Sequence, residues 1–130
     1  MAKPFLKSFS SIAKKYDSKI TILICIQVDT WHHKFYDSRA DAELLKKQKK
    51  TITPHIEKLE TLANKSNISM KSQILRSLSV VKDITTYAKS HKFGLIVMGS
   101  HGRTGIDKLI LGSIANGVLQ KSSCPVLIIK

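Results

Sequence analysis

The sequence predicts an α/β fold, an open parallel sheet with helices on both faces, from three observations. Helix-like and strand-like segments alternate along the chain, which is typical of parallel sheets built from strand–helix–strand units. The segment 19–28 is β-branched and apolar on both faces, as expected of a strand that helices cover on each side. Glycines follow the apolar run 95–98, where ligands bind in such sheets, beyond the carboxyl ends of the strands.

The first half of the chain is expected to hold two helices and two strands. Helices are predicted at 4–16 and 41–65, and strands at 19–28 and 68–75. The helix 41–65 has an apolar stripe made of Ala42, Leu45, Ile52, Ile56, Leu59 and Ala63. Pro54 should kink this helix or split it in two. A loop from Asp29 to Ser38 precedes it, and the alternating pattern of 68–75 favours a strand near a sheet edge.

The second half continues the alternation and contains the glycines. Helices are predicted at 79–91 and 113–121, and strands at 94–98 and 126–129. Right-handed crossovers then limit the topology of the sheet. The carboxyl ends of the strands 19–28 and 94–98 should face one cleft, which makes Val28 and Gly99 neighbours of the same ligand.

Length and composition indicate a single globular domain over 1–130. No apolar stretch approaches the ~20 residues of a membrane span, and Met1–Ser10 lacks the apolar segment of a signal peptide. Cys25 and Cys124 are far apart and in no C-x-x-C arrangement, which favours reduced thiols. A cytoplasmic protein is therefore expected.

The chain is strongly basic, with 22 Lys and Arg residues against 9 Asp and Glu residues and a formal charge of +13. Such a charge attracts polyanions, including nucleotides and nucleic acids. The lysine run at Lys46, Lys47, Lys49 and Lys50 is interpreted as a solvated helix face. It lacks the aromatic or arginine partners that base recognition needs, so nucleic acid is not the favoured partner.

The most informative motif is Gly99-x2-Gly102-x9-Gly112-Ser113, at the exit of an apolar strand and the start of a helix. Glycine lets the main chain approach a ligand closely because it has no Cβ atom. The first turn of a helix offers unpaired N–H groups and the positive end of the helix dipole. This spacing predicts a phosphate-binding loop.

The motif and its flanks, Met98, SHGRTG and SSCPVLII, resemble the universal stress protein family, whose ATP-binding signature is Gly-x2-Gly-x9-Gly-(Ser/Thr). The resemblance reaches back more weakly to about Lys7. It implies a Rossmann-like domain over 1–130 that binds ATP, with or without Mg²⁺, and regulates a stress response. Nucleotide binding would act by shifting the protein towards one conformation.

The resemblance assigns eight nucleotide-binding residues. They are Val28, Met98, Gly99, Gly102, Arg103, Gly112, Ser113 and Ile114. The three glycines and Ser113 would expose backbone N–H groups to phosphate and ribose, and Ser113 adds a hydroxyl. Val28, Met98 and Ile114 correspond to apolar positions near the base and ribose, although each could equally be a core residue. Arg103 could meet phosphates, but a solvated basic loop would have the same composition.

The resemblance fails at the N-terminus. Members of the family begin with a strand that lies in the middle of the sheet, in the order 3-2-1-4-5, and that ends in an Asp near the nucleotide; no such strand precedes Lys3. Three explanations compete. The chain could be shortened, the strands 19–28 and 94–98 could pair directly, or another chain could donate a strand.

The sequence does not point to an enzyme beyond slow ATP hydrolysis. It has no Gly-Lys-Ser/Thr phosphate loop, and no nucleophile–base or carboxylate pair stands out. His101 has no evident orienting partner, and the adjacent His32 and His33 lack a third metal ligand. No catalytic residue and no metal site are therefore expected.

A homodimer is expected through the last strand, Val126, Leu127, Ile128 and Ile129, which is short, apolar and at a sheet edge. In the family this strand commonly pairs with its copy. Two other functions stay open: a scaffolding dimer of the same fold that binds no nucleotide, and a basic protein that binds polyanions or nucleic acid.

Overall fold

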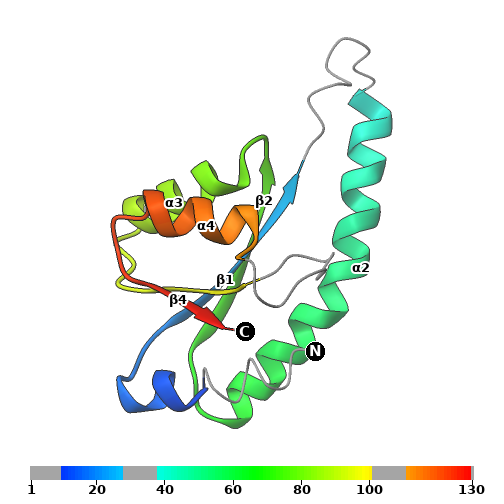
Figure 1. Ribbon diagram of the computed structural model, residues 1–130. Coiled ribbons are helices and arrows are strands. Elements are labelled where there is room, and N and C mark those ends of the chain that lie inside the picture. Colours follow the sequence, from blue (N-terminus) through cyan, green and yellow to red (C-terminus); the bar gives the residue numbers. More distant parts are fainter. Residues whose placement is uncertain (1–9, 28–37, 101–110, 130) are drawn as a thin grey trace. The chain divides into compact units, whose positions relative to one another are not determined.

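The computed structural model describes residues 10–27, 38–100 and 111–129. The chain forms two compact units, Met1–Arg76 and Ser77–Lys130. Each unit is built from strands and helices in alternation, as the sequence predicts (Figure 1).

The first unit contains a helix at 10–15, strand β1 (Ile20–Gln27), helix α2 (Ser38–Lys65) and most of strand β2 (Met70–Ser77). β1 and β2 form a two-stranded sheet. The N–H of Ile20 donates to the carbonyl of Ser69 at 2.9 Å. Both strands therefore start at the same end of the sheet, as parallel strands do.

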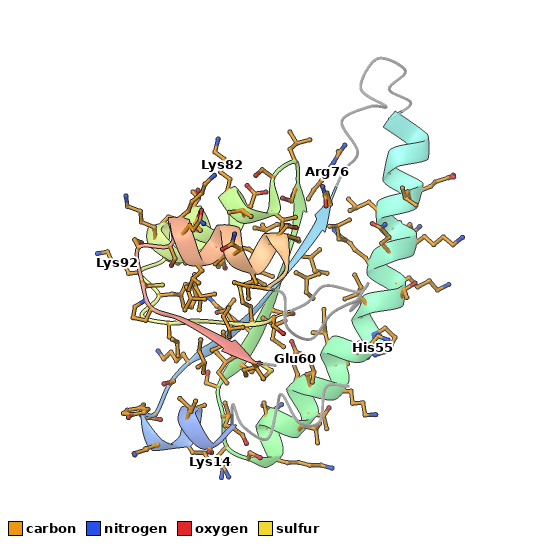
Figure 2. All side chains as sticks on the ribbon, in the orientation of Figure 1. Lys14, His55, Glu60, Arg76, Lys82 and Lys92 are labelled. Atoms are coloured by element: carbon orange, nitrogen blue, oxygen red, sulfur yellow. The ribbon has the colours of Figure 1, made fainter. Side chains whose placement is uncertain are left out.

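Helix α2 is one continuous helix of 28 residues, and Pro54 lies inside it. It bends part-way along its length, close to His55, the residue after Pro54 (Figures 1 and 2). Proline removes one helical hydrogen bond and its ring pushes on the preceding turn, which accounts for a bend. The expected kink is observed, whereas the expected split into two helices is not.

A small core holds the start of β1 and the end of α2 together. Its buried members are Ala13, Ile20, Ala63 and Ile68, with Met70 packed against them. Ile56 of α2 is buried as well, so the predicted apolar stripe is confirmed in the second half of the helix. Ala42, at the other end of the stripe, is exposed instead.

Three helices end in the same way, with one residue in the left-handed backbone region. These residues are Asp17 (φ 49°), Asn67 (φ 56°) and Lys92 (φ 56°). In each case the next residue donates its N–H to a carbonyl five residues earlier: Ser18 to Ala13, Ile68 to Ala63, and Phe93 to Ala88. This is the Schellman arrangement, which satisfies the last carbonyls of a helix.

The second unit contains helix α3 (Val80–Ser90), strand β3 (Ile96–Gly99), helix α4 (Ser113–Lys121) and strand β4 (Val126–Ile129). β3 and β4 are parallel, with Ile96 opposite Val126 and Gly99 opposite Ile129. Helices α3 and α4 lie against each other (Figure 1). α4 and β4 have the predicted bounds, and α3 begins one residue after the predicted start because Ser79 is its N-cap.

The fold class is confirmed as α/β with parallel strands and no barrel. The described strands form the pairs β1–β2 and β3–β4. In the family's strand order 3-2-1-4-5, β1 and β2 correspond to the family's strands 2 and 3, and β3 and β4 to its strands 4 and 5. In the described ranges, no helix is long and apolar enough to cross a membrane.

Candidate functional site: the end of β3 and the start of α4

Strand β3 ends at Gly99, and the chain comes back to this point at Gly112, twelve residues after Ser100. The N–H of Ser100 donates to the carbonyl of Ile129 at 3.0 Å, which extends the pairing of β3 with β4 by one bond. The carbonyl of Ser100 then accepts a hydrogen bond from the N–H of Gly112 at 2.7 Å. Two residues of the predicted motif, Gly99 and Gly112, are thereby brought together at the carboxyl end of β3.

Helix α4 starts at this place with a glycine. Gly112 is its N-cap residue, and within the described ranges no side chain makes a capping hydrogen bond. The carbonyl of Gly112 accepts the first helical bond, from the N–H of Asn116 at 2.9 Å. The N–H groups of Ser113, Ile114 and Ala115 precede that bond, so helix geometry gives them no carbonyl partner within α4.

The charge at this helix end favours an anion. The first turn of α4 carries no acidic residue that would neutralise the positive end of the helix dipole. Unpaired N–H groups combined with that dipole bind phosphate and carboxylate groups in many proteins. The arrangement can therefore hold an anionic group by backbone donors alone.

The side chains around the helix start divide into exposed and packed ones. Ser113 is exposed, and Ile114 keeps 39% of its surface exposed. Met98 is half-buried on β3. The start of α4 therefore presents one hydroxyl and one apolar side chain at the surface.

Packing behind the helix start keeps it in place. Val118 is completely buried and Ala115 is 3% exposed, so one face of α4 is fixed in the core of the second unit. Gly117 approaches Val81 of α3 so closely that no side chain would fit between the two helices without a shift. The donors of α4 are therefore carried by a well-packed element, which a preorganised binding site requires.

Five of the eight predicted site residues lie in the described ranges: Met98, Gly99, Gly112, Ser113 and Ile114. Val28, Gly102 and Arg103 lie outside them, as do His101, His32 and His33, so their roles stay predictions. Among the described side chains, no group of three or more His, Cys, Asp or Glu residues could hold a metal ion.

Ser100 is a structural residue of this site that the sequence analysis missed. It is 6% exposed, and its backbone joins β3 to both β4 and the start of α4. Its signal in the sequence is weak, because the contacts involve the main chain, which any residue provides. Only its position directly after Gly99, where a small residue leaves room for the returning chain, could have drawn attention to it.

Comparison with known proteins places this geometry in a family. The model of the universal stress protein family matches residues 2–130. Universal stress protein MJ0531 of Methanocaldococcus jannaschii is 27% identical over 122 residues, which cover 92% of this chain and 69% of that relative. Several other universal stress proteins match over less than half of their own length.

Solved structures show the same fold. Universal stress protein UspA from Lactobacillus plantarum superposes with a TM-score of 0.80 at 20% identity, over 99% of this chain and 89% of that one. A universal stress protein in complex with cAMP superposes with a TM-score of 0.64 at 18% identity, over 95% of this chain and 83% of that one. The family match spans nearly the whole chain, and the chain therefore belongs to the universal stress protein family.

Proposed function

We propose that this protein binds ATP or a related adenine nucleotide at the end of β3 and the start of α4, and that it acts as a regulator in a stress response. The observation that carries the proposal is the hydrogen bond from the Gly112 N–H to the Ser100 carbonyl. It brings the uncapped N-terminus of α4 to the carboxyl end of a parallel strand, which is where such sheets bind ligands.

Each part of the nucleotide has a counterpart in the proposed site. The phosphates accept hydrogen bonds from the N–H groups at the start of α4, and the hydroxyl of Ser113 adds one donor. Gly102 and Arg103 complete the phosphate contacts, as the sequence motif implies. Val28, Met98 and Ile114 supply apolar surface for the base and ribose. A relative crystallised with cAMP supports an adenine nucleotide as the ligand class.

The proposed role is regulatory because the described residues at the site offer binding groups without a reactive pair. Backbone donors and a serine hydroxyl hold a phosphate chain but provide no general base. A nucleotide that binds one conformation more tightly shifts the protein towards that conformation. The size of the shift is limited by the difference between its affinities for the two conformations. Hydrolysis of ATP, if measured, would be slow.

The same proposal includes a cytoplasmic homodimer that forms through β4. Strand β4 pairs with β3, and Leu127 in its middle keeps 37% of its side chain exposed. An apolar edge strand can pair with its own copy across a two-fold axis. Each contact of the interface then forms twice, once from each subunit. A scaffolding dimer that binds no nucleotide is the competing function.

Mass spectrometry of the small molecules released on denaturing the purified protein tests the proposal without assuming which nucleotide binds. The account predicts ATP, ADP or AMP near one molecule per chain in protein prepared without added nucleotide. A folded protein that releases none, and that also fails to bind added ATP, would favour the scaffolding dimer instead.

A further inference from the structure

Helix α4 contains a glycine where it packs against α3. Gly117 lies in the middle of the nine residues of α4. Glycine is among the least favourable residues inside a helix, because its backbone loses the most freedom there. A Cβ atom on Gly117 would lie 2.8 Å from Cγ2 of Val81 in α3. The close approach of the two helices therefore accounts for this glycine, since helix formation disfavours it.

The space between Gly117 and Val81 is too small for a methyl group. Ordinary van der Waals contacts of a Cβ atom begin at 3.4 Å, so an alanine at 117 would require a separation of 3.4 − 2.8 = 0.6 Å. A valine has few alternative rotamers in a helix, so its side chain cannot take up this movement. The backbones of the helices have to move instead. A binding site tolerates displacements of only about 0.5 Å, which makes this movement significant.

A push at Gly117 would reach the start of α4. Ala115 and Val118 are buried and hold the helix in the core, so α4 cannot retreat from α3 as a rigid cylinder without disturbing their packing. Ser113 lies one turn before Gly117 on the same face of the helix, and its side chain is exposed. The least confined movement is therefore a tilt or slide that displaces this first turn.

The first turn of α4 carries the proposed phosphate donors. It is attached to β3 by the hydrogen bond from the Gly112 N–H to the Ser100 carbonyl, at 2.7 Å. The N–H groups of Ser113, Ile114 and Ala115 follow directly. Hydrogen bonds weaken steeply when the angle at the donor departs from linearity. A displacement of this turn would therefore weaken the bonds that the donors make to a phosphate group.

We propose that Gly117 is a positioning residue for the nucleotide and that Val81 is its partner in that role. The contact between them sets where the donors of α4 lie, although neither residue belongs to the predicted binding residues. The proposal rests on the proposed function, because it concerns the same donors. It extends that function to α3, a helix that carries none of the eight predicted site residues. Nucleotide affinity then depends on how α3 and α4 pack.

Isothermal titration with ATP tests the role of Gly117 in the full chain. Gly117→Ala should fold, because alanine favours a helix, and should bind ATP about tenfold more weakly than the native protein. That factor corresponds to the loss of about one hydrogen bond to a charged group. Val81→Ala removes both methyl groups from the contact. Gly117→Ala combined with Val81→Ala should therefore bind ATP within about twofold of Val81→Ala alone.

Two controls separate positioning from the general effects of a substitution. Gly94→Ala adds the same Cβ atom where it meets nothing within 4 Å, and should keep the native affinity. Ile68→Val removes a buried methyl group from the core of the first unit, and should lower stability without changing ATP affinity. Equal affinities of the native protein and Gly117→Ala, a loss that Val81→Ala does not rescue, or an equal loss in either control would overturn the positioning role. These outcomes leave the proposed function intact, whereas a native protein that binds no ATP would overturn both.

Discussion

A Cβ atom on Gly117 would lie 2.8 Å from Cγ2 and 3.1 Å from Cγ1 of Val81. The first distance is shorter than real Cβ contacts and the second is tighter than most of them, so α3 and α4 approach each other at a point that favours a glycine. Valine has a stiff side chain and cannot turn away easily. The contact explains why a residue that disfavours helices lies in the middle of α4, the helix that carries the proposed phosphate donors.

Gly117→Val should destabilise the protein, because branched methyl groups would collide with Val81. Overpacking of this kind costs about 1–3 kcal/mol. Urea unfolding followed by circular dichroism measures the change. Gly94→Ala is the matched control, since a Cβ atom there meets nothing within 4 Å, and its effect should stay within about 0.5 kcal/mol. Restoration of stability in the double variant Gly117→Ala with Val81→Ala, relative to Gly117→Ala alone, would establish the contact directly.

Lys92→Gly should stabilise the protein, since glycine adopts the left-handed conformation without the strain that lysine bears. The expected gain in unfolding free energy is about 1 kcal/mol. Lys89→Gly is the matched control: it lies inside α3, where glycine should cost about 0.5–1 kcal/mol. A loss of stability in Lys92→Gly would mean that contacts of the lysine side chain outweigh the strain.

Pro54→Ala should raise the stability of the first unit. Alanine restores a helical hydrogen bond to the Lys50 carbonyl and removes the ring from the preceding turn, and a proline inside a helix costs up to about 3 kcal/mol. Pro54 is exposed, so its replacement leaves no cavity. The midpoint of urea unfolding should move upwards, while His55→Ala should leave it within about 0.5 kcal/mol. A lower midpoint in Pro54→Ala would show that the bend of α2 is needed for packing.

Leu127→Lys should weaken the proposed dimer without unfolding the chain. Like charges placed against each other across two paired strands repel, and two-fold symmetry puts each new lysine near its copy. Light scattering coupled to size-exclusion chromatography should show a shift from dimer to monomer. Leu44→Lys, at an exposed leucine of α2, is the control. An unchanged dimer in Leu127→Lys would exclude β4 from the interface.

The sequence predicted the elements best where local chemistry marks their ends. Gly112-Ser113 marks the start of α4, and the predicted bounds of α4 and β4 match the structure. The start of β2 was predicted two residues early, because the apolar Ile68 resembles a strand residue. Its N–H instead donates to the Ala63 carbonyl and closes the end of α2. The start of α2 was predicted late, since Ser38 reads as the end of a loop and Asp41 as a helix start.

The contacts between elements could not be predicted from the sequence. Nothing in the pattern of α4 shows that Gly117 meets Val81, because that contact depends on how two helices pack. The stack of Tyr87 on His91 also follows from the turn at Lys92, and a lysine there gives no sequence signal for a left-handed residue. The glycine motif was informative because it specifies a backbone shape, which sequence spacing does encode.

Isothermal titration of the native protein and of Gly112→Val with ATP tests the central claim most directly. Gly112 has φ −60° and ψ 154°, a conformation open to valine, so the variant should fold. The valine side chain would crowd the donors at the start of α4. The account predicts binding by the native protein and at least about tenfold weaker binding by Gly112→Val, a difference of about 1.4 kcal/mol. Equal ATP affinities of the two folded proteins would contradict the proposed site.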